Sequence, residues 1–152
     1  MATTLNNAQL VVRVTEKVTL NGRELGNTNK HVISGINEVS ERIFTVPTSQ
    51  VTILSASSGV GAGTYLSSSI QYIRVTNLDD TNFVRLSFSS GSNTSSNTAD
   101  FKLPAKRSIM FTNTAFSGSA EGAAFDTFSD FTNLKGTADT SSVDIELFVA
   151  TT

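Results

Sequence analysis

The sequence predicts an all-β fold, an antiparallel sandwich of the jelly-roll kind with roughly eight to ten strands and little helix. Short stretches of alternating apolar and polar residues recur from Ala8 to Val149, and Gly, Asn, Asp, Ser or Pro separate them. No stretch keeps a helical period, and short strands at regular spacing are typical of sandwiches and barrels. We therefore expect residues 1–152 to form a single β-sandwich domain.

The composition fits a domain that is held together by packing alone. At 152 residues the chain is long enough to bury roughly two-thirds of its unfolded surface. It has no Cys, which excludes disulfides, thiolate nucleophiles and Cys-ligated zinc. Charged residues make up only 16% of the chain, against about 25% in typical domains, and hydroxyls of Ser and Thr replace them. Such surfaces are suited to packing against other protein.

The charge pattern argues against a nucleic-acid partner, and the lack of a long apolar stretch argues against a membrane span. The net charge is −2, whereas binding through phosphates needs clustered Lys and Arg. The densest basic group, Lys102, Lys106 and Arg107, fits a solvated hairpin tip. The start of the chain lacks a basic segment followed by an apolar run, and no apolar stretch has the length of a membrane span. We expect a protein that is made and used without the membrane.

The first strand is expected over residues 10–20, with one buried and one solvated face. The apolar residues of one parity are Leu10, Val12, Val14, Val18 and Leu20. Glu16 breaks this parity and indicates a bulge or a bend. Asn21 and Gly22 predict a type I′ turn, because both central positions of that turn need positive φ. The chain then returns through residues 23–25, or after a wider loop through residues 30–36.

The next strands are expected over residues 43–46 and 51–54. Pro47 lies between them and cannot donate a ladder hydrogen bond, so they form two strands or one kinked strand. Residues 55–63 contain several glycines, but no helix is expected behind them. A mobile loop therefore fits better than a phosphate cradle. Residues 65–75 then read as strand.

A hairpin is expected over residues 70–77 and 83–88, with residues 78–81 as its loop. Asp79 and Asp80 in this loop are turn formers through Asx hydrogen bonds, or alternatively ligands of Ca²⁺. Residues 89–98 form a polar low-complexity stretch and predict a second mobile loop. Residues 101–103 then lead into a tight turn at residues 104–107, and the chain returns through residues 109–111.

The segment 112–133 is Phe-rich and irregular. It is either a loop that plugs one end of the sandwich or a subunit interface, because interface cores are rich in aromatics and poor in charge. The candidate interface residues are Phe116, Phe125, Phe128 and Phe131. After this segment, Val143, Ile145, Leu147 and Val149 alternate with polar residues and predict the final strand. A C-terminus tied into the sheet suggests a complete module.

No catalytic set is visible, so we expect no enzyme, no catalytic residue, no metal and no cofactor. His31 is the only His, has no Cys partner and lies in an expected strand. No nucleophile-elbow motif accompanies any Ser. Asp126 with Asp130, or Asp144 with Glu146, are the acidic pairs that a glycosidase could use, but Asp144 and Glu146 simply mark the outer face of a strand.

Three stretches carry a resemblance. They are Met1 to Ala8, the run Tyr72-Ile73-Arg74-Val75-Thr76-Asn77-Leu78-Asp79-Asp80-Thr81-Asn82, and Asp144 to Ala150. Over its whole length the chain resembles a group of small proteins of marine tailed bacteriophages and cyanophages. The shared stretches are a hairpin and a terminal strand, so they imply kinship and a virion component rather than an activity.

Within the virion we favour a capsid decoration or cement protein, which stabilises the head through protein contacts, because the chain is small, shows no coiled coil and has an early strand that can pair with a neighbour's edge. Its expected partners are further copies of the chain, as a homo-oligomer and more specifically a trimer, and the major capsid protein, with no direct nucleic acid contact. Its expected location is the virion, after synthesis in the host cytoplasm. The alternatives are a tail, neck or fibre-knob subunit, or a carbohydrate-binding sandwich. Sugar sites use exposed aromatic rings, and Tyr65 and Tyr72 are the candidates.

Overall fold

The computed structural model describes residues 8–56, 63–66, 69–90, 97–112 and 131–152, and these residues are nearly all in strands. The chain divides into two compact units, Met1–Asn37 and Glu38–Thr152. We call the first unit the arm and the second the body. The division differs from the single domain over residues 1–152 that the sequence predicts.

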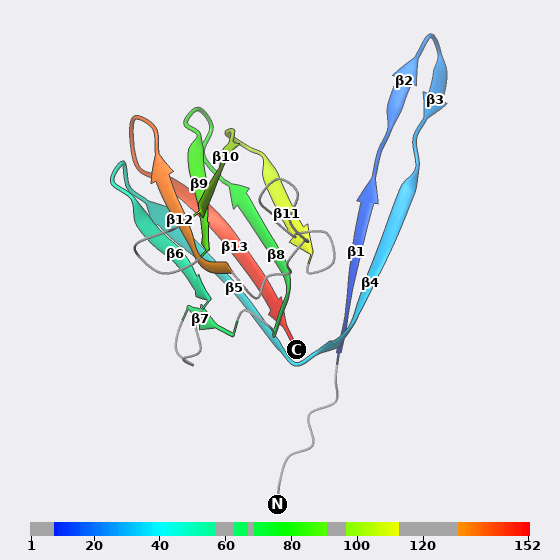
Figure 1. Ribbon diagram of the computed structural model, residues 1–152. Coiled ribbons are helices and arrows are strands. Elements are labelled where there is room, and N and C mark those ends of the chain that lie inside the picture. Colours follow the sequence, from blue (N-terminus) through cyan, green and yellow to red (C-terminus); the bar gives the residue numbers. More distant parts are fainter. Residues whose placement is uncertain (1–7, 57–62, 67–68, 91–96, 113–130) are drawn as a thin grey trace, which may run out of the picture. The chain divides into compact units, whose positions relative to one another are not determined.

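The body contains nine described strands in two sheets (Figure 1). The strands are β5 (Glu38–Val46), β6 (Val51–Ala56), β7 (Thr64–Tyr65), β8 (Ile70–Asn77), β9 (Val84–Ser90), β10 (Asn97–Leu103), β11 (Ser108–Thr112), β12 (Phe131–Ala138) and β13 (Val143–Thr151). One sheet has the order β11-β8-β13-β5, and the other has the order β10-β9-β12-β6-β7. Only the β6–β7 pair among them is parallel.

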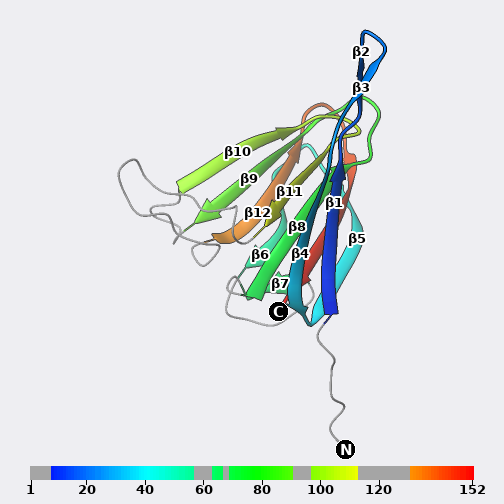
Figure 2. The same cartoon turned by 90° about the vertical axis from the view of Figure 1, so that its right-hand side faces the viewer.

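The strand order is that of a jelly roll. Without the short β7, each sheet has four antiparallel strands, and the chain passes between the sheets at all but one of its connections, the one from β9 to β10. The two outermost strands in sequence, β5 and β13, lie side by side in the same sheet, which closes two Greek keys on each other. Figure 2 shows the strands of both sheets from the side. The all-β sandwich that the sequence predicts is confirmed.

The core lies between the two sheets. On β13 the side chains of Val143, Ile145, Leu147 and Val149 are all buried, as the alternation predicts. Three phenylalanines add an aromatic cluster that joins the sheets. The ring centroids of Phe88 and Phe111 lie 4.8 Å apart, and Phe101 lies within 5.8 Å of both, all in edge-to-face geometry.

The hairpin expected over residues 70–88 is wrong. Strand β8 pairs with β11 and β13, whereas β9 pairs with β10 and β12 in the other sheet. The backbone N–H of Leu78 donates to the carbonyl of Asp144, at 2.9 Å, directly after β8 ends. The chain thus stays bound to β13 as it leaves the sheet, and it crosses to the second sheet instead of folding back. The strands on either side of the turn at residues 104–107, β10 and β11, also lie in different sheets and do not pair with each other.

Several expected boundaries shift. Residues 65–75 are not one strand, because β7 ends at Tyr65 and β8 begins at Ile70. The expected loops at 55–63 and 89–98 are shorter than predicted, since β6 extends to Ala56, β9 to Ser90, and β10 begins at Asn97. Residues 57–62, 91–96 and 113–130 lie outside the described residues. Residues 43–46 and 51–54 do belong to two strands, in different sheets.

The arm is a long β-hairpin. Strands β1 (Ala8–Thr15) and β4 (Thr28–Ile36) pair along their whole length, and the hairpin continues into β2 (Val18–Leu20) and β3 (Arg23–Leu25). At its end, Asn21 and Gly22 have φ of 50° and 77°, so the type I′ turn is confirmed. After the turn the chain returns through β3 and then β4, so both of the segments that the sequence left as alternatives, 23–25 and 30–36, are strands.

The expected first strand is interrupted at Glu16, where β1 ends and β2 has not begun. The backbone N–H of Glu16 donates to the carbonyl of Asn27 across the interruption, at 2.9 Å. Gly26 lies against this point so closely that a Cβ there would stand 2.0 Å from the Glu16 carbonyl oxygen. The interruption at Glu16 is therefore made possible by a glycine on the opposite strand of the hairpin.

Candidate interaction surface

The residues considered for catalysis do not come together in the described part of the chain. His31 is exposed on β4 of the arm. Asp144 and Glu146 lie on the outer face of β13, where Glu146 is ion-paired with Arg74. Asp126 and Asp130 lie outside the described residues. Among the residues described, no group of three or more His, Cys, Asp or Glu side chains could hold a metal ion.

Asp79 forms the Asx turn that its position predicts. Its carboxylate accepts hydrogen bonds from the backbone N–H groups of Asn82, at 2.6 Å, and Thr81, at 2.7 Å. These two bonds favour the ionised form and lower the pKa of Asp79. Asp80 instead pairs with Lys106, at 2.7 Å. The turn-forming interpretation is therefore confirmed for Asp79, whereas for Asp80 the structure shows an ion pair and no Asx bond.

Asn77 ties this loop to its neighbours, a role that the sequence analysis missed. Asn77 is buried, with only 1% of the residue's surface exposed. Its amide nitrogen donates to the carbonyls of Asn82, at 2.9 Å, and Leu103, at 3.2 Å, and its amide oxygen accepts from the N–H of Asp79. The stretch that carries the phage resemblance is thus, at this end, a structural clamp between loops.

The basic group Lys102, Lys106 and Arg107 is distributed between separate partners. The Lys106 ammonium binds Asp80, which raises the pKa of Lys106. The Lys102 ammonium lies 4.3 Å from the centroid of the Phe83 ring. These positions agree with a solvated turn, and they do not form one continuous anion-binding patch.

Arg42 connects the two sheets at the β5 side of the sandwich. Its guanidinium donates to the Ile53 carbonyl of β6 and lies 5.7 Å from the centroid of the Phe44 ring. Gly63 packs against it so closely that a Cβ there would lie 2.9 Å from Nη1 of Arg42. Within the described residues the Nε of Arg42 is buried without a hydrogen-bond partner.

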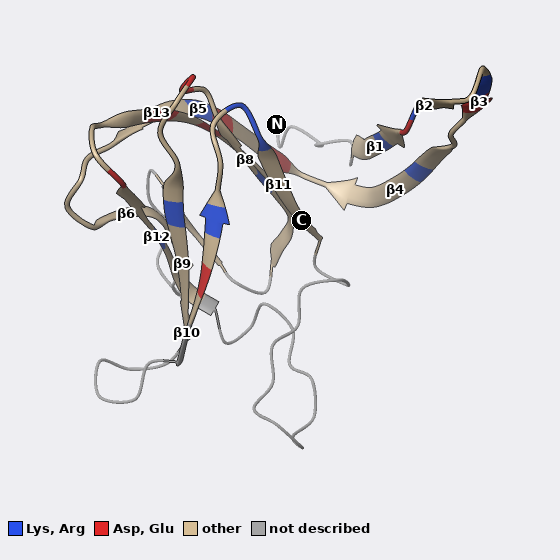
Figure 3. Ribbon diagram, turned by 90° about the horizontal axis from the view of Figure 1, so that it is seen from above, with Lys and Arg blue, Asp and Glu red and all other residues tan. Residues whose placement is uncertain are grey.

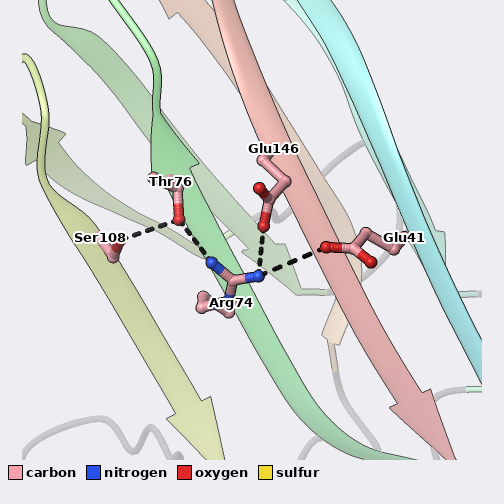
Figure 4. A network of polar contacts seen from close by, with 5 residues as sticks. All are labelled: Glu41, Arg74, Thr76, Ser108 and Glu146. Atoms are coloured by element: carbon pink, nitrogen blue, oxygen red, sulfur yellow. Dashed lines mark hydrogen bonds and ion pairs between the residues drawn. The ribbon is translucent and has the colours of Figure 1, made fainter.

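The outer face of the β11-β8-β13-β5 sheet carries an ordered polar network (Figure 4). Arg74 on β8 donates to Glu146 on β13 and, at 3.1 Å, to the hydroxyl of Thr76. Thr76 in turn is 2.8 Å from the hydroxyl of Ser108 on β11. Glu41 on β5 lies 3.7 Å from the same guanidinium. The network joins all four strands across the face.

Apolar side chains lie beside this network on the edge strand β5. Val39 is 53% exposed and Ile43 is 69% exposed, and the exposed Glu41 lies between them in the same strand. Successive odd residues of a strand share one face, so the three form an apolar–acidic–apolar row. We call Val39, Glu41 and Ile43 the β5 row. Exposed apolar residues of this size next to fixed charges are typical of protein contact surfaces.

The arm presents two faces that follow from its register. On one face Leu10 lies opposite Ile33 and Val12 opposite His31. On the other face Val11 lies opposite Val32, and Arg13 lies opposite Lys30. We call these last four residues the Arg13–Lys30 face. Figure 3 shows basic positions on both β1 and β4. Like charges directly opposite each other on paired strands repel, so an acidic group on this face would be favourable.

The arm strands leave much of their apolar surface exposed. Among the described strands, β1 and β4 pair only with each other, and β2 and β3 only with each other. The large apolar residues that remain 39–58% exposed are Val11, Val14, Val18, Leu20, Leu25 and Val32. A two-stranded hairpin without further packing is marginally stable in water. Covering the exposed half of each side chain would contribute about 1 kcal/mol per residue.

The other candidate residues are placed as follows. Tyr65 and Tyr72 are both buried, so neither ring forms an exposed platform for a sugar. Phe131 begins β12, and its backbone pairs with Ser90 of β9. Phe116, Phe125 and Phe128 lie outside the described residues, so the expected Phe interface stays a prediction.

Comparison with known protein families, curated proteins and solved structures finds no match for this chain. Among the described residues no helix has the length and apolar character that a membrane span requires. Two features emerge as candidates for function, the arm and the β5 row. Sequence analysis missed the pairing of Arg13 with Lys30 as a surface, although the Asn21-Gly22 turn fixes the register that places them opposite each other.

Proposed function

We propose that this chain is a non-enzymatic structural protein of a virus particle, which stabilises the capsid head by contacts with other protein. The observation that carries the proposal is the arm. A long hairpin with exposed apolar residues on strands that lack further strand partners adds interface area rather than chemistry. Such a segment suits a protein that works by assembly.

The body supports the same proposal. The jelly roll is a fold that viral capsid proteins use, along with lectins and cupins. Since one fold serves many functions, this is an analogy and adds weight only beside the arm. The Asp79 turn, the Asn77 clamp and the Arg74 network all hold the body rigid, and none of them leaves a reactive group at a cavity.

The composition of the surface and the resemblance lead to the proposed partners. With 16% charged residues and a net charge of −2, the chain is suited to contacts with protein and not with nucleic acid. The resemblance to small proteins of tailed bacteriophages leads us to propose the major capsid protein and further copies of this chain as its partners. The proposed place is the outer surface of the head, as a decoration or cement protein.

Immunogold electron microscopy of the virus particles that carry this gene tests the proposal, with antibody raised against the purified body. We expect gold over the whole head surface, and particles stripped of the chain should lose DNA at a lower temperature. Gold confined to one vertex or to the tail would overturn the decoration role in favour of a neck or fibre subunit. Particles without gold would overturn the virion role altogether.

A further inference from the structure

The charges of the two units are opposite in sign. The arm has four basic residues, Arg13, Lys17, Arg23 and Lys30, against two acidic ones, Glu16 and Glu24, so its net charge is +2. The body has a net charge of −4. Lys17 pairs with Glu24 at 2.9 Å, but Arg13 and Lys30 form no ion pair within the described part of the chain. Two unpaired cations therefore remain side by side on one face of the arm.

The β5 row of the body offers one acidic residue between two apolar ones, and its Glu41 also lies 3.7 Å from the Arg74 guanidinium of the same body. Along β1, Val11 precedes Arg13 by two positions, and along β5, Val39 precedes Glu41 by two positions. Both spacings place an apolar residue and a charge next to each other on one face of a strand. The row lies on an edge strand, since β5 pairs with β13 on one side and with no described strand on the other. Asp144 of β13, which lies opposite Thr45, adds a further acidic group on the same face.

We infer that the arm of one copy docks on the β5 row of a second copy. Arg13 and Lys30 then face Glu41, while Val11 and Val32 pack against Val39 and Ile43. The inference rests on the proposed assembly function and names the partner that the arm binds first, which is another molecule of this chain.

The two units are joined by a single residue. Strand β4 ends at Ile36 and β5 begins at Glu38, so Asn37 alone joins them. Every copy has both an arm and a β5 row, so two copies can exchange arms reciprocally.

The surface area that docking buries gives an estimate of how strongly two copies associate. The paired part of β1 and β4 is about 10 Å wide and about 26 Å long, so docking buries roughly 500 Å² in total for each arm. A reciprocal exchange of two arms buries roughly 1,000 Å², which is at the low end for specific interfaces. We therefore expect self-association that depends on protein concentration and that weakens as salt screens the charges.

Sedimentation velocity of the purified full chain over a range of concentrations tests the inference with two charge reversals. The double variant R13E/K30E places two carboxylates against Glu41, and E41K places an ammonium against Arg13 and Lys30. Each variant alone should weaken self-association by at least about tenfold. An equimolar mixture of the two should associate again, because each arm then meets a row of opposite charge. Docking within one molecule would give no such rescue.

Matched variants control for net charge and folding. K17E/R23E makes the same charge change in the arm but outside the Arg13–Lys30 face. D139K makes the same charge change as E41K at an exposed position between β12 and β13. Both should leave the association constant within about twofold, and circular dichroism should report a folded body in every variant.

Three results would overturn arm exchange: a monomer at every concentration, association that neither reversal changes, and a mixture that stays dissociated. Failure of the proposed function gives a different pattern. In that case the arms exchange as described, yet immunogold finds no chain on the particles. If the chain is on the particles and R13E/K30E associates normally, arm exchange fails and the structural role stands.

Discussion

In the body, the inner face of β13 meets a second sheet, and its four apolar residues are fully buried. In the arm, β1 and β4 form a sheet of two strands, and Val11, Val14 and Val32 stay exposed. The body therefore satisfies its apolar pattern within one chain. The arm leaves part of its apolar pattern exposed within the described residues.

Hydrogen exchange should show the largest difference between the two regions. Amides of β8 and β13 open only when the body unfolds, whereas those of β1 and β4 open locally. At high dilution we expect arm amides to exchange at least about a thousandfold faster than those of β13, as measured by mass spectrometry of peptides. Rising protein concentration should slow the arm selectively. An arm that is as protected as β13 at high dilution would remove the contrast.

Truncation of a core residue should destabilise the body strongly. Leu147 is 1% exposed and lies in the core, so Leu147→Ala leaves a cavity and should cost about 3 kcal/mol in the free energy of unfolding. The matched arm variant is Leu20→Ala, which removes the same atoms from an exposed position and should cost less than about 0.5 kcal/mol. Urea unfolding measures both. Equal losses would mean that the arm is packed like the body.

Loss of the Asn77 clamp should rank next. Asn77→Ala removes three hydrogen bonds and leaves the Leu103 carbonyl and its neighbours without their partner, at a cost of about 2 kcal/mol. Asn29→Ala on the arm strand β4 is the control, because Asn29 is exposed, and it should change stability by less than about 0.5 kcal/mol. Thermal unfolding at low concentration compares them. Similar melting temperatures would exclude the clamp.

The Arg74 network should contribute less, because its groups are partly solvated. The side chains of Arg74 and Glu146 are 29% and 25% exposed, so Glu146→Gln should cost about 0.5–1 kcal/mol. Glu41 lies farther from the guanidinium and is 59% exposed, so Glu41→Gln should leave the stability of the monomer nearly unchanged. Unfolding at low and high salt measures both variants. A larger loss for Glu41→Gln would reverse the order that the distances predict.

The pH dependence of stability provides the smallest test. The lowered pKa of Asp79 means that its ionised turn stabilises the body above the unfolded pKa of about 3.9. This contribution is lost as the pH falls through the folded pKa. Asp79→Asn keeps the acceptor oxygen but removes the titration, so its stability should fall less than that of the wild type in acid. Parallel curves in urea unfolding at a series of pH values would contradict the assignment.

Local features of the fold follow from the sequence, and pairings over long distances do not. The Asn21-Gly22 turn, the Asp79 turn and the final strand depend on neighbouring residues, and all three match the structure. The expected hairpin over residues 70–88 fails because alternation predicts a strand without its partner. The choice between sheets depends on pairings such as that of β8 with β13, which join residues far apart in the chain.

The candidate surface is predictable to a similar extent. Alternation in residues 10–20 is the same whether a strand is buried or lacks a partner, so it cannot reveal that the arm is a separate unit. The charges of Arg13 and Lys30 are visible in the sequence, but their position opposite each other needs the register of the hairpin. The β5 row needs the packing of the body, which buries one face of β5 and leaves Val39 and Ile43 on the other face 53% and 69% exposed.

The single residue between β4 and β5 has a mechanical consequence. Strand β5 pairs with β13 from Glu38 to Val46, and antiparallel ladder bonds run perpendicular to the strands. A pull on the arm along β5 therefore loads all of these bonds in shear at the same time, instead of opening them one by one. An anchored arm would therefore transmit tension directly into the β11-β8-β13-β5 sheet of the body.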